Sequence, residues 1–127
     1  MPHPLTPIDI NLDLTMLLAD AADDRKAGDI CLFKVSEVTY IAEYFVIVTG
    51  YSRTQVRAIA DAMEYKAKEE LQREPLRKEG ESDRSWIVLD YGDVIAHVML
   101  PEQREYYNLE AFWGHSEKLD FTPIPQS

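Results

Sequence analysis

Apolar residues recur with a helical period in two long segments of the chain. The first stripe runs through residues 12–27 and the second through residues 53–73. Ser52 and Gln55 fit a capping box at the start of the second segment, and Pro75 follows its end. Residues three and four apart share one face of a helix, so the pattern predicts two amphipathic helices.

Strands are predicted where apolar runs are short, rich in β-branched residues or alternating: 30–35, 44–49, 86–91 and 94–100. The run at 44–49 is continuous, which is typical of a central strand buried on both faces. Gly92 and Asp93 separate the last two runs and indicate a two-residue hairpin loop. The polar segment 76–84 could add a short edge strand.

A last helix is predicted from Pro101, because proline is favoured at the first helical position. Tyr106, Leu109 and Trp113 are expected to share one face of it. The element order is then α-β-β-α-(β)-β-β-α. This order predicts a single compact α/β layer domain, a mixed β-sheet with flanking helices.

The domain is expected to occupy residues 12–114. A flexible arm with three prolines is expected at 1–11, and a polar tail at 115–127. No internal repeat and no linker divides the chain.

Charge narrows the range of partners. The 127 residues carry 13 Lys and Arg against 23 Asp and Glu, a formal net charge of −10, and residues 80–127 alone hold 9 acids and 3 bases. Phosphate backbones are bound by basic surfaces, so DNA is excluded as a main ligand and little direct RNA contact is expected. The charge favours a basic partner protein.

Location follows from what the sequence lacks. It contains no apolar run long enough to span a membrane and no basic, apolar signal segment at its start. Cys31 is the only cysteine, which is typical of a reducing compartment. We expect a cytoplasmic protein.

Catalytic chemistry is weakly indicated. The turn from Thr49 to Ser52 joins a strand to a helix N-terminus, where amides can hold an anion, but a simple helix cap explains it as well. Two-metal chemistry needs converging carboxylates, for example at i and i+2 on a strand, and the predicted strands carry none. Asp90 and Asp93 flank the hairpin loop, and His97 lies within a strand without metal-ligand spacing. No metal or cofactor is predicted.

Aromatic residues gather in the acidic C-terminal third. Six of the thirteen aromatics fall within 28 residues, including the neighbours Tyr106 and Tyr107. Adjacent residues on a helix point about 100° apart, so the two tyrosines cannot both face the same core. Aromatic and arginine side chains are common anchors of protein interfaces.

Four stretches of the chain resemble the ribosomal silencing factor family, RsfS, also called the Iojap family. They are residues 26–30, residues 43–52 (EYFVIVTGYS), residues 79–80 (EG) followed by 86–98 (WIVLDYGDVIAHV), and residues 104–110 (REYYNLE) with Trp113 after them. Glu43 and Ala96 depart from the family's usual Asp and Val. The resemblance covers residues 12–114 in order.

The resemblance implies a nucleotidyltransferase-like fold without catalytic carboxylates and a role as a translation factor that is not an enzyme. Family members bind the large ribosomal subunit through the ribosomal protein called L-fourteen, block joining of the small subunit and repress translation under nutrient limitation. The resemblance also implies that two copies of the chain can associate as a homodimer.

The expected partner-binding residues form or support one docking face: Trp86, Asp90, Gly92, Asp93, His97, Arg104, Tyr106, Tyr107 and Glu110. Rings would supply its desolvated centre and carboxylates its charge complementarity. Two other functions stay open, a metal-dependent nucleotidyltransferase-like enzyme and a generic adaptor dimer that uses the same aromatic surface.

Overall fold

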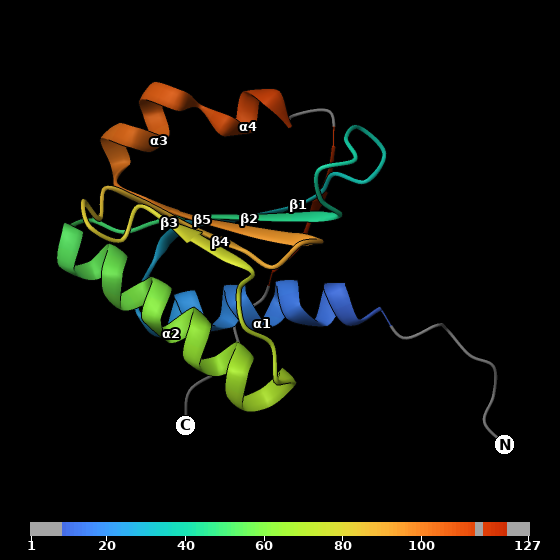
Figure 1. The fold of residues 1–127 in the computed structure, drawn as a ribbon. Helices are drawn as coiled ribbons and strands as arrows, with labels where there is room; N and C mark the ends of the chain where they lie inside the picture. The colour runs from blue at the N-terminus through green and yellow to red at the C-terminus, as the bar shows by residue number, and fades with distance from the viewer. Residues whose placement is uncertain (1–8, 114–115, 122–127) are drawn as a thin grey trace, which may run out of the picture.

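The structure, a computed structural model, describes residues 9–113 and 116–121 (Figure 1). Residues 1–8 of the arm expected at 1–11 lie outside the described part of the chain. The tail expected at 115–127 lies outside it at residue 115 and from residue 122 onward.

A six-stranded mixed sheet forms the middle layer, in the order β3-β4-β5-β2-β1-β6. In this sheet the central strands β2 and β5 run parallel, and the other four pairs of neighbouring strands run antiparallel. The mixed sheet predicted from the sequence is therefore confirmed. The strands are β1 (Gly28–Lys34), β2 (Tyr44–Thr49), β3 (Arg77–Glu79), β4 (Trp86–Asp90), β5 (Val94–Met99) and β6 (Glu117–Leu119).

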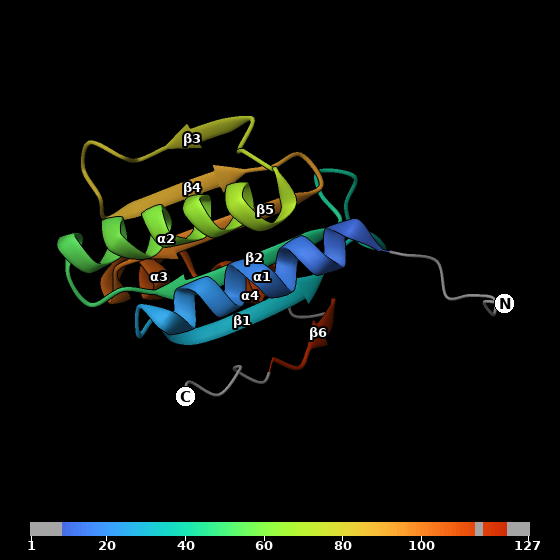
Figure 2. The same cartoon turned by 90° about the horizontal axis from the view of Figure 1, so that it is seen from below.

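Helices cover the two faces of the sheet unequally. The long helices α1 (Ile10–Asp24) and α2 (Arg53–Leu71) lie on one face, and the short helices α3 (Pro101–Tyr107) and α4 (Leu109–Phe112) lie on the other (Figures 1 and 2). Short helices bury less surface than long ones. The face under α3 and α4 is therefore the less protected of the two.

The main core lies between the sheet and the two long helices. Every residue of β2 is buried, which confirms the central strand expected at 44–49. Leu14 and Leu18 of α1 meet Ile59 and Met63 of α2 in this layer, and all four side chains are fully buried. The apolar stripes of the sequence thus face the sheet, as amphipathic helices require.

The start of α2 explains the turn after β2. The Oγ atom of Ser52 accepts a hydrogen bond from the Gln55 amide at 3.0 Å. The side chain of Gln55 reaches back to the Tyr51 amide at 2.7 Å, one residue earlier than a standard capping box. The helix-cap interpretation is confirmed, and the Tyr51 amide is already occupied.

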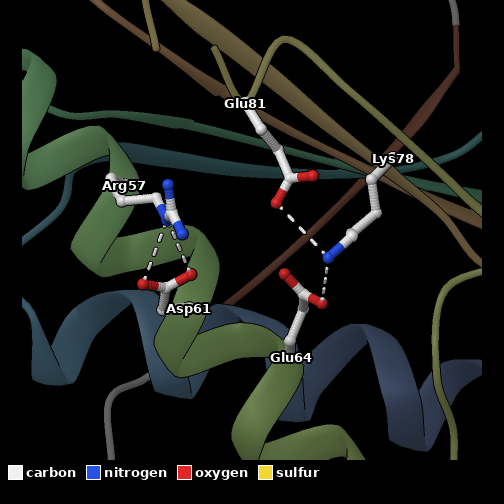
Figure 3. Close-up of polar contacts among 5 residues, drawn as sticks. All are labelled: Arg57, Asp61, Glu64, Lys78 and Glu81. Atoms are coloured by element: carbon white, nitrogen blue, oxygen red, sulfur yellow. Dashed lines mark hydrogen bonds and ion pairs between the residues drawn. The ribbon is translucent and has the colours of Figure 1, made fainter.

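Ion pairs tether the edge strand β3 to α2 (Figure 3). The Nζ atom of Lys78 lies 3.2 Å from Glu64 of α2 and 3.3 Å from Glu81 in the following turn. Along α2 itself, Arg57 and Asp61 form an exposed pair at 3.1 Å. The exposed pair within α2 contributes only about 0–1 kcal/mol, whereas the partly buried Lys78 pairs hold β3 beside α2.

Two parts of the C-terminal region differ from the sequence prediction. The single helix expected from Pro101 is broken at Asn108, which adopts the left-handed conformation (φ 44°, ψ 56°) and separates α3 from α4. Asparagine tolerates this conformation better than most residues. The prediction that Tyr106 shares one helix face with Leu109 and Trp113 is therefore wrong. Tyr106 is 81% exposed, while the other two pack on the sheet.

Strand β6 was not predicted. It pairs with β1 within the segment expected to be a polar tail, and Leu119 packs against the main core. A strand of three residues with one inward apolar side chain has too little pattern to be recognised by periodicity.

Candidate functional site

The sheet face under α3 and α4 carries a continuous row of aromatic rings. Neighbouring ring centroids in the row lie 4.8–5.9 Å apart, within the range of favourable aromatic contact. Strands β2, β4 and β5, helix α3 and the residue that follows α4 contribute to it. In order, the rings are Tyr106, Tyr107, Trp86, His97, Phe45 and Trp113.

The row is exposed at one end and buried in its middle. Tyr106 is 81% exposed and Tyr107 is 46% exposed, whereas His97 and Phe45 are buried. The two tyrosines therefore point differently, as their adjacent positions predicted, and both offer ring surface to a partner.

Trp86 and His97 are joined by a hydrogen bond. The indole Nε1–H of Trp86 donates to Nδ1 of His97 at 3.1 Å. Burial lowers the pKa of His97 to about 4, so its imidazole is neutral at physiological pH. Since Nδ1 accepts a hydrogen bond, the single proton of the neutral ring lies on Nε2, which has no hydrogen-bonding partner among the described residues.

Arg104 lies beneath the face rather than on it, because only 8% of the residue is exposed. Its guanidinium donates to Thr49 Oγ1 at 2.8 Å and to Glu110 Oε2 at 3.1 Å, and it contacts Cys31 Sγ at 3.3 Å. Arg104 therefore connects α3, α4 and two strands. Arg104 thus has a structural role between these elements, and Glu110 is held in this ion pair.

The hairpin residues lie at the opposite end of β4 and β5 from α3. Gly92 has a φ of +93°, which favours glycine, and its amide donates to Asp90 Oδ1 at 2.8 Å. Asp90 also pairs with Arg77 of β3 at 3.5 Å. These contacts make Asp90 part of the turn that it flanks in the sequence. Asp93 is exposed, and its Oδ2 accepts a hydrogen bond from Asn11 at 3.4 Å.

The nine residues predicted for the docking face thus form two groups. Six gather around α3 and the near ends of the strands, and Asp90, Gly92 and Asp93 form the hairpin group. A hollow of about 290 Å³ lies between the groups, and Asp90 and His97 both line it.

Sequence reasoning missed the apolar lining of this hollow. Val88 and Ile95 lie on the same face as His97, and Ile41 in the loop before β2 is 65% exposed beside them. The signal was present in the alternation of β4, where Trp86, Val88 and Asp90 occupy every second position.

Within residues 9–113 and 116–121, no three His, Cys, Asp or Glu side chains are gathered as metal ligands. In the same part of the chain, no strand carries two carboxylates two residues apart. None of the helices described there is long and apolar enough to cross a membrane.

Comparison with known families and proteins agrees with this architecture. A family model described as "Ribosomal silencing factor during starvation" matches residues 9–127. The chain is 36% identical over 114 residues to ribosomal silencing factor RsfS of Halalkalibacterium halodurans, covering 90% of this chain and 97% of that protein. It is 37% identical over 120 residues to the chloroplastic protein Iojap of Arabidopsis thaliana, covering 92% of this chain and 48% of that one.

Solved structures share the fold. A crystal structure of a Chromobacterium violaceum protein superposes with a TM-score of 0.79 at 34% identity, over 90% of this chain and 93% of that one. A Bacillus halodurans structure gives a TM-score of 0.76 at 33% identity, over 87% and 100%. The chain belongs to the ribosomal silencing factor (RsfS/Iojap) family, and the resemblance seen in its sequence is confirmed.

Proposed function

We propose that this protein binds the large ribosomal subunit through the ribosomal protein L-fourteen and thereby blocks joining of the small subunit. The observation that carries the proposal is the acidic, ring-bearing sheet face that the short helices leave partly uncovered. Tyr106 and Tyr107 expose ring surface on it, and Glu105 beside them on α3 exposes a carboxylate. Exposed aromatic surface beside acidic groups suits a basic protein partner.

The mechanism requires occupancy of a surface and no bond chemistry. A folded domain bound where two subunits meet prevents their contact by its volume alone. The net charge of −10 would favour basic ribosomal protein over exposed RNA. Relatives are named for silencing rather than for a reaction, which supports a role without catalysis. A mitochondrial relative from Mus musculus, 32% identical, is named for assembly of the ribosomal large subunit.

The proposal includes repression of translation under nutrient limitation, which the family description "during starvation" supports. We further propose that the protein acts in the cytoplasm and that two copies can associate as a homodimer. Sedimentation of the purified protein over a range of concentrations tests the homodimer.

The direct test mixes purified protein with separated ribosomal subunits and resolves them on a sucrose gradient. We expect the protein to migrate with the large subunit and the peak of joined ribosomes to shrink. The matched controls are Tyr106→Ser on the docking face and Tyr65→Ser on α2, since Tyr65 is also exposed, at 69%, but lies on the opposite face. Only Tyr106→Ser should restore joining. Normal joining with the large subunit saturated by protein would contradict the proposal.

The contact with L-fourteen is tested separately. The isolated ribosomal protein should bind the wild-type chain in a pull-down and bind Tyr106→Ser less. Binding to the large subunit without any binding to L-fourteen would leave the subunit as the partner and remove L-fourteen as the contact.

A further inference from the structure

The hollow on the docking face has an apolar interior and a charged rim. Its apolar lining comes from the sheet, the loop before β2 and helix α4: Ile41, Phe45, Val88, Ile95, Leu109 and Trp113. Arg77, Glu79 and Asp90 line its other side, with Arg77 and Asp90 paired at 3.5 Å. The rim therefore carries two carboxylates and one guanidinium.

One polar group in this hollow lacks a partner. His97 is 9% exposed and lines the hollow, and its Nε2 is buried without a hydrogen-bonding partner among the described residues. Because Nδ1 accepts from Trp86, Nε2 carries the proton and is a donor. A buried donor without an acceptor costs free energy, and a binding partner that supplies an acceptor recovers it.

Size and charge define the occupant. At about 290 Å³, with a shallow apolar floor on the sheet, the hollow has room for one large side chain of a partner. Interface hot spots commonly consist of one side chain seated in such a pocket. The acidic excess of the rim favours a basic protein as the donor of that side chain.

We propose that the hollow receives one apolar side chain of the basic partner and that His97 Nε2–H donates a hydrogen bond to a backbone carbonyl beside it. The inference rests on the proposed function, since it assigns the anchor point of the same docking face. It makes His97 a specificity-determining residue, because a segment that fills the hollow without an acceptor leaves the donor buried and unpaired.

Access to Nε2 requires a small movement of the lining. Leu109 and Trp113 are only partly buried; Leu109 begins, and Trp113 directly follows, a helix of four residues that comes after the left-handed Asn108. Such a short helix has few contacts to lose when a side chain of the partner enters. The expected movement is confined to α4.

Two substitutions test the roles of the two ring nitrogens of His97 separately. In His97→Asn, the amide oxygen can still accept from Trp86, but no donor reaches the position of Nε2. In His97→Gln, the longer side chain places an N–H near Nε2. Affinity for the isolated large subunit is measured for both, together with melting temperature. We expect His97→Gln to stay within about twofold of wild type and His97→Asn to lose about three- to tenfold.

A second variant tests the hollow independently of His97. Val88→Trp fills it from β4, and Lys68→Trp places the same ring on an exposed position of α2. Val88→Trp should lose at least tenfold in affinity while keeping a melting temperature close to wild type. Lys68→Trp should bind normally.

The outcomes separate this inference from the proposed function. If wild type binds the large subunit and both His97 variants bind equally well, or both lose affinity equally, the hydrogen bond to a partner carbonyl is refuted. If Val88→Trp folds and binds as wild type, the hollow is not the anchor site. If wild type itself does not bind the large subunit, the proposed function fails and the inference fails with it.

Discussion

The guanidinium of Arg104 donates a hydrogen bond to the hydroxyl of Thr49, 2.8 Å away, and so fixes helix α3 to the end of the central strand β2. Fifty-five residues separate the two in sequence. The same guanidinium holds Glu110 at the start of α4, so one buried side chain orients both short helices over the docking face. The exposed tyrosines at the end of α3 depend on this contact for their position.

Replacement of Arg104 by methionine should therefore destabilise the fold. The change leaves Thr49 and Glu110 without their partner, and we expect a loss of about 2–4 kcal/mol in the free energy of unfolding, measured by urea denaturation. Arg57→Met is the control, because Arg57 forms an exposed ion pair on α2 and should cost less than about 0.5 kcal/mol. Equal, small losses in both variants would show that Arg104 does not orient the helices.

Tyr106→Ser should weaken binding to the large subunit without affecting stability. The ring is 81% exposed and packs edge-on against Tyr107, so its removal leaves no cavity in the core. An aromatic anchor at an interface contributes about 1–2 kcal/mol, which corresponds to roughly five- to thirtyfold in affinity. Co-sedimentation at graded subunit concentrations measures the change. An unaltered affinity would place the docking surface elsewhere.

Asp93→Lys should weaken binding in a salt-dependent way. The carboxylate is exposed at the hairpin, where reversal of its charge changes long-range attraction to a basic partner. We expect a loss of about three- to tenfold at low ionic strength that diminishes as salt is added. Glu70→Lys, an exposed charge reversal near the end of α2, is the matched control and should bind normally. Equal effects of the two reversals would indicate that only total charge matters.

Stability should fall as the pH is lowered from about 6.5 to about 4. Burial lowers the pKa of His97 from 6.5 to about 4, so over this window the unfolded chain binds a proton at this residue and the folded chain does not. The pH-dependent stabilisation from His97 is fully present above 6.5, the pKa of the residue in the unfolded chain. It amounts to about 3 kcal/mol at most.

Urea denaturation of wild type and His97→Gln at several pH values isolates this effect. Their difference in unfolding free energy should change between pH 6.5 and 4 and be constant above pH 7. The pKa of Asp9 is lowered chiefly by the backbone amide of Leu12, so its stabilisation is present above its usual value of 3.8 and is lost as the pH falls through that value, mostly beneath this window. A constant difference across the whole range would contradict the low pKa of His97.

Much of the fold followed from local patterns in the sequence. The stripe of α2, its Ser52 cap and the Gly92-Asp93 loop each depend on residues close together in the chain, and each is found as predicted. The family resemblance also rested on contiguous stretches. Local patterns fail where an element is short, as at β6, or where one residue such as Asn108 interrupts a helical period.

The candidate site shows a second limit of prediction from the sequence. The sequence identified the aromatic and acidic residues of the C-terminal third, but only the tertiary structure decided which of them are exposed. Arg104 and Tyr106 are two residues apart on one short helix, yet one is buried and the other is almost fully exposed. Burial depends on which elements pack against a residue, and the pairing of β4 with β5 and the docking of α3 on β2 are contacts between distant segments. The sequence by itself determined the longer elements and the family, and the packing of the elements decided the hollow, the free donor of His97 and the proposed docking face.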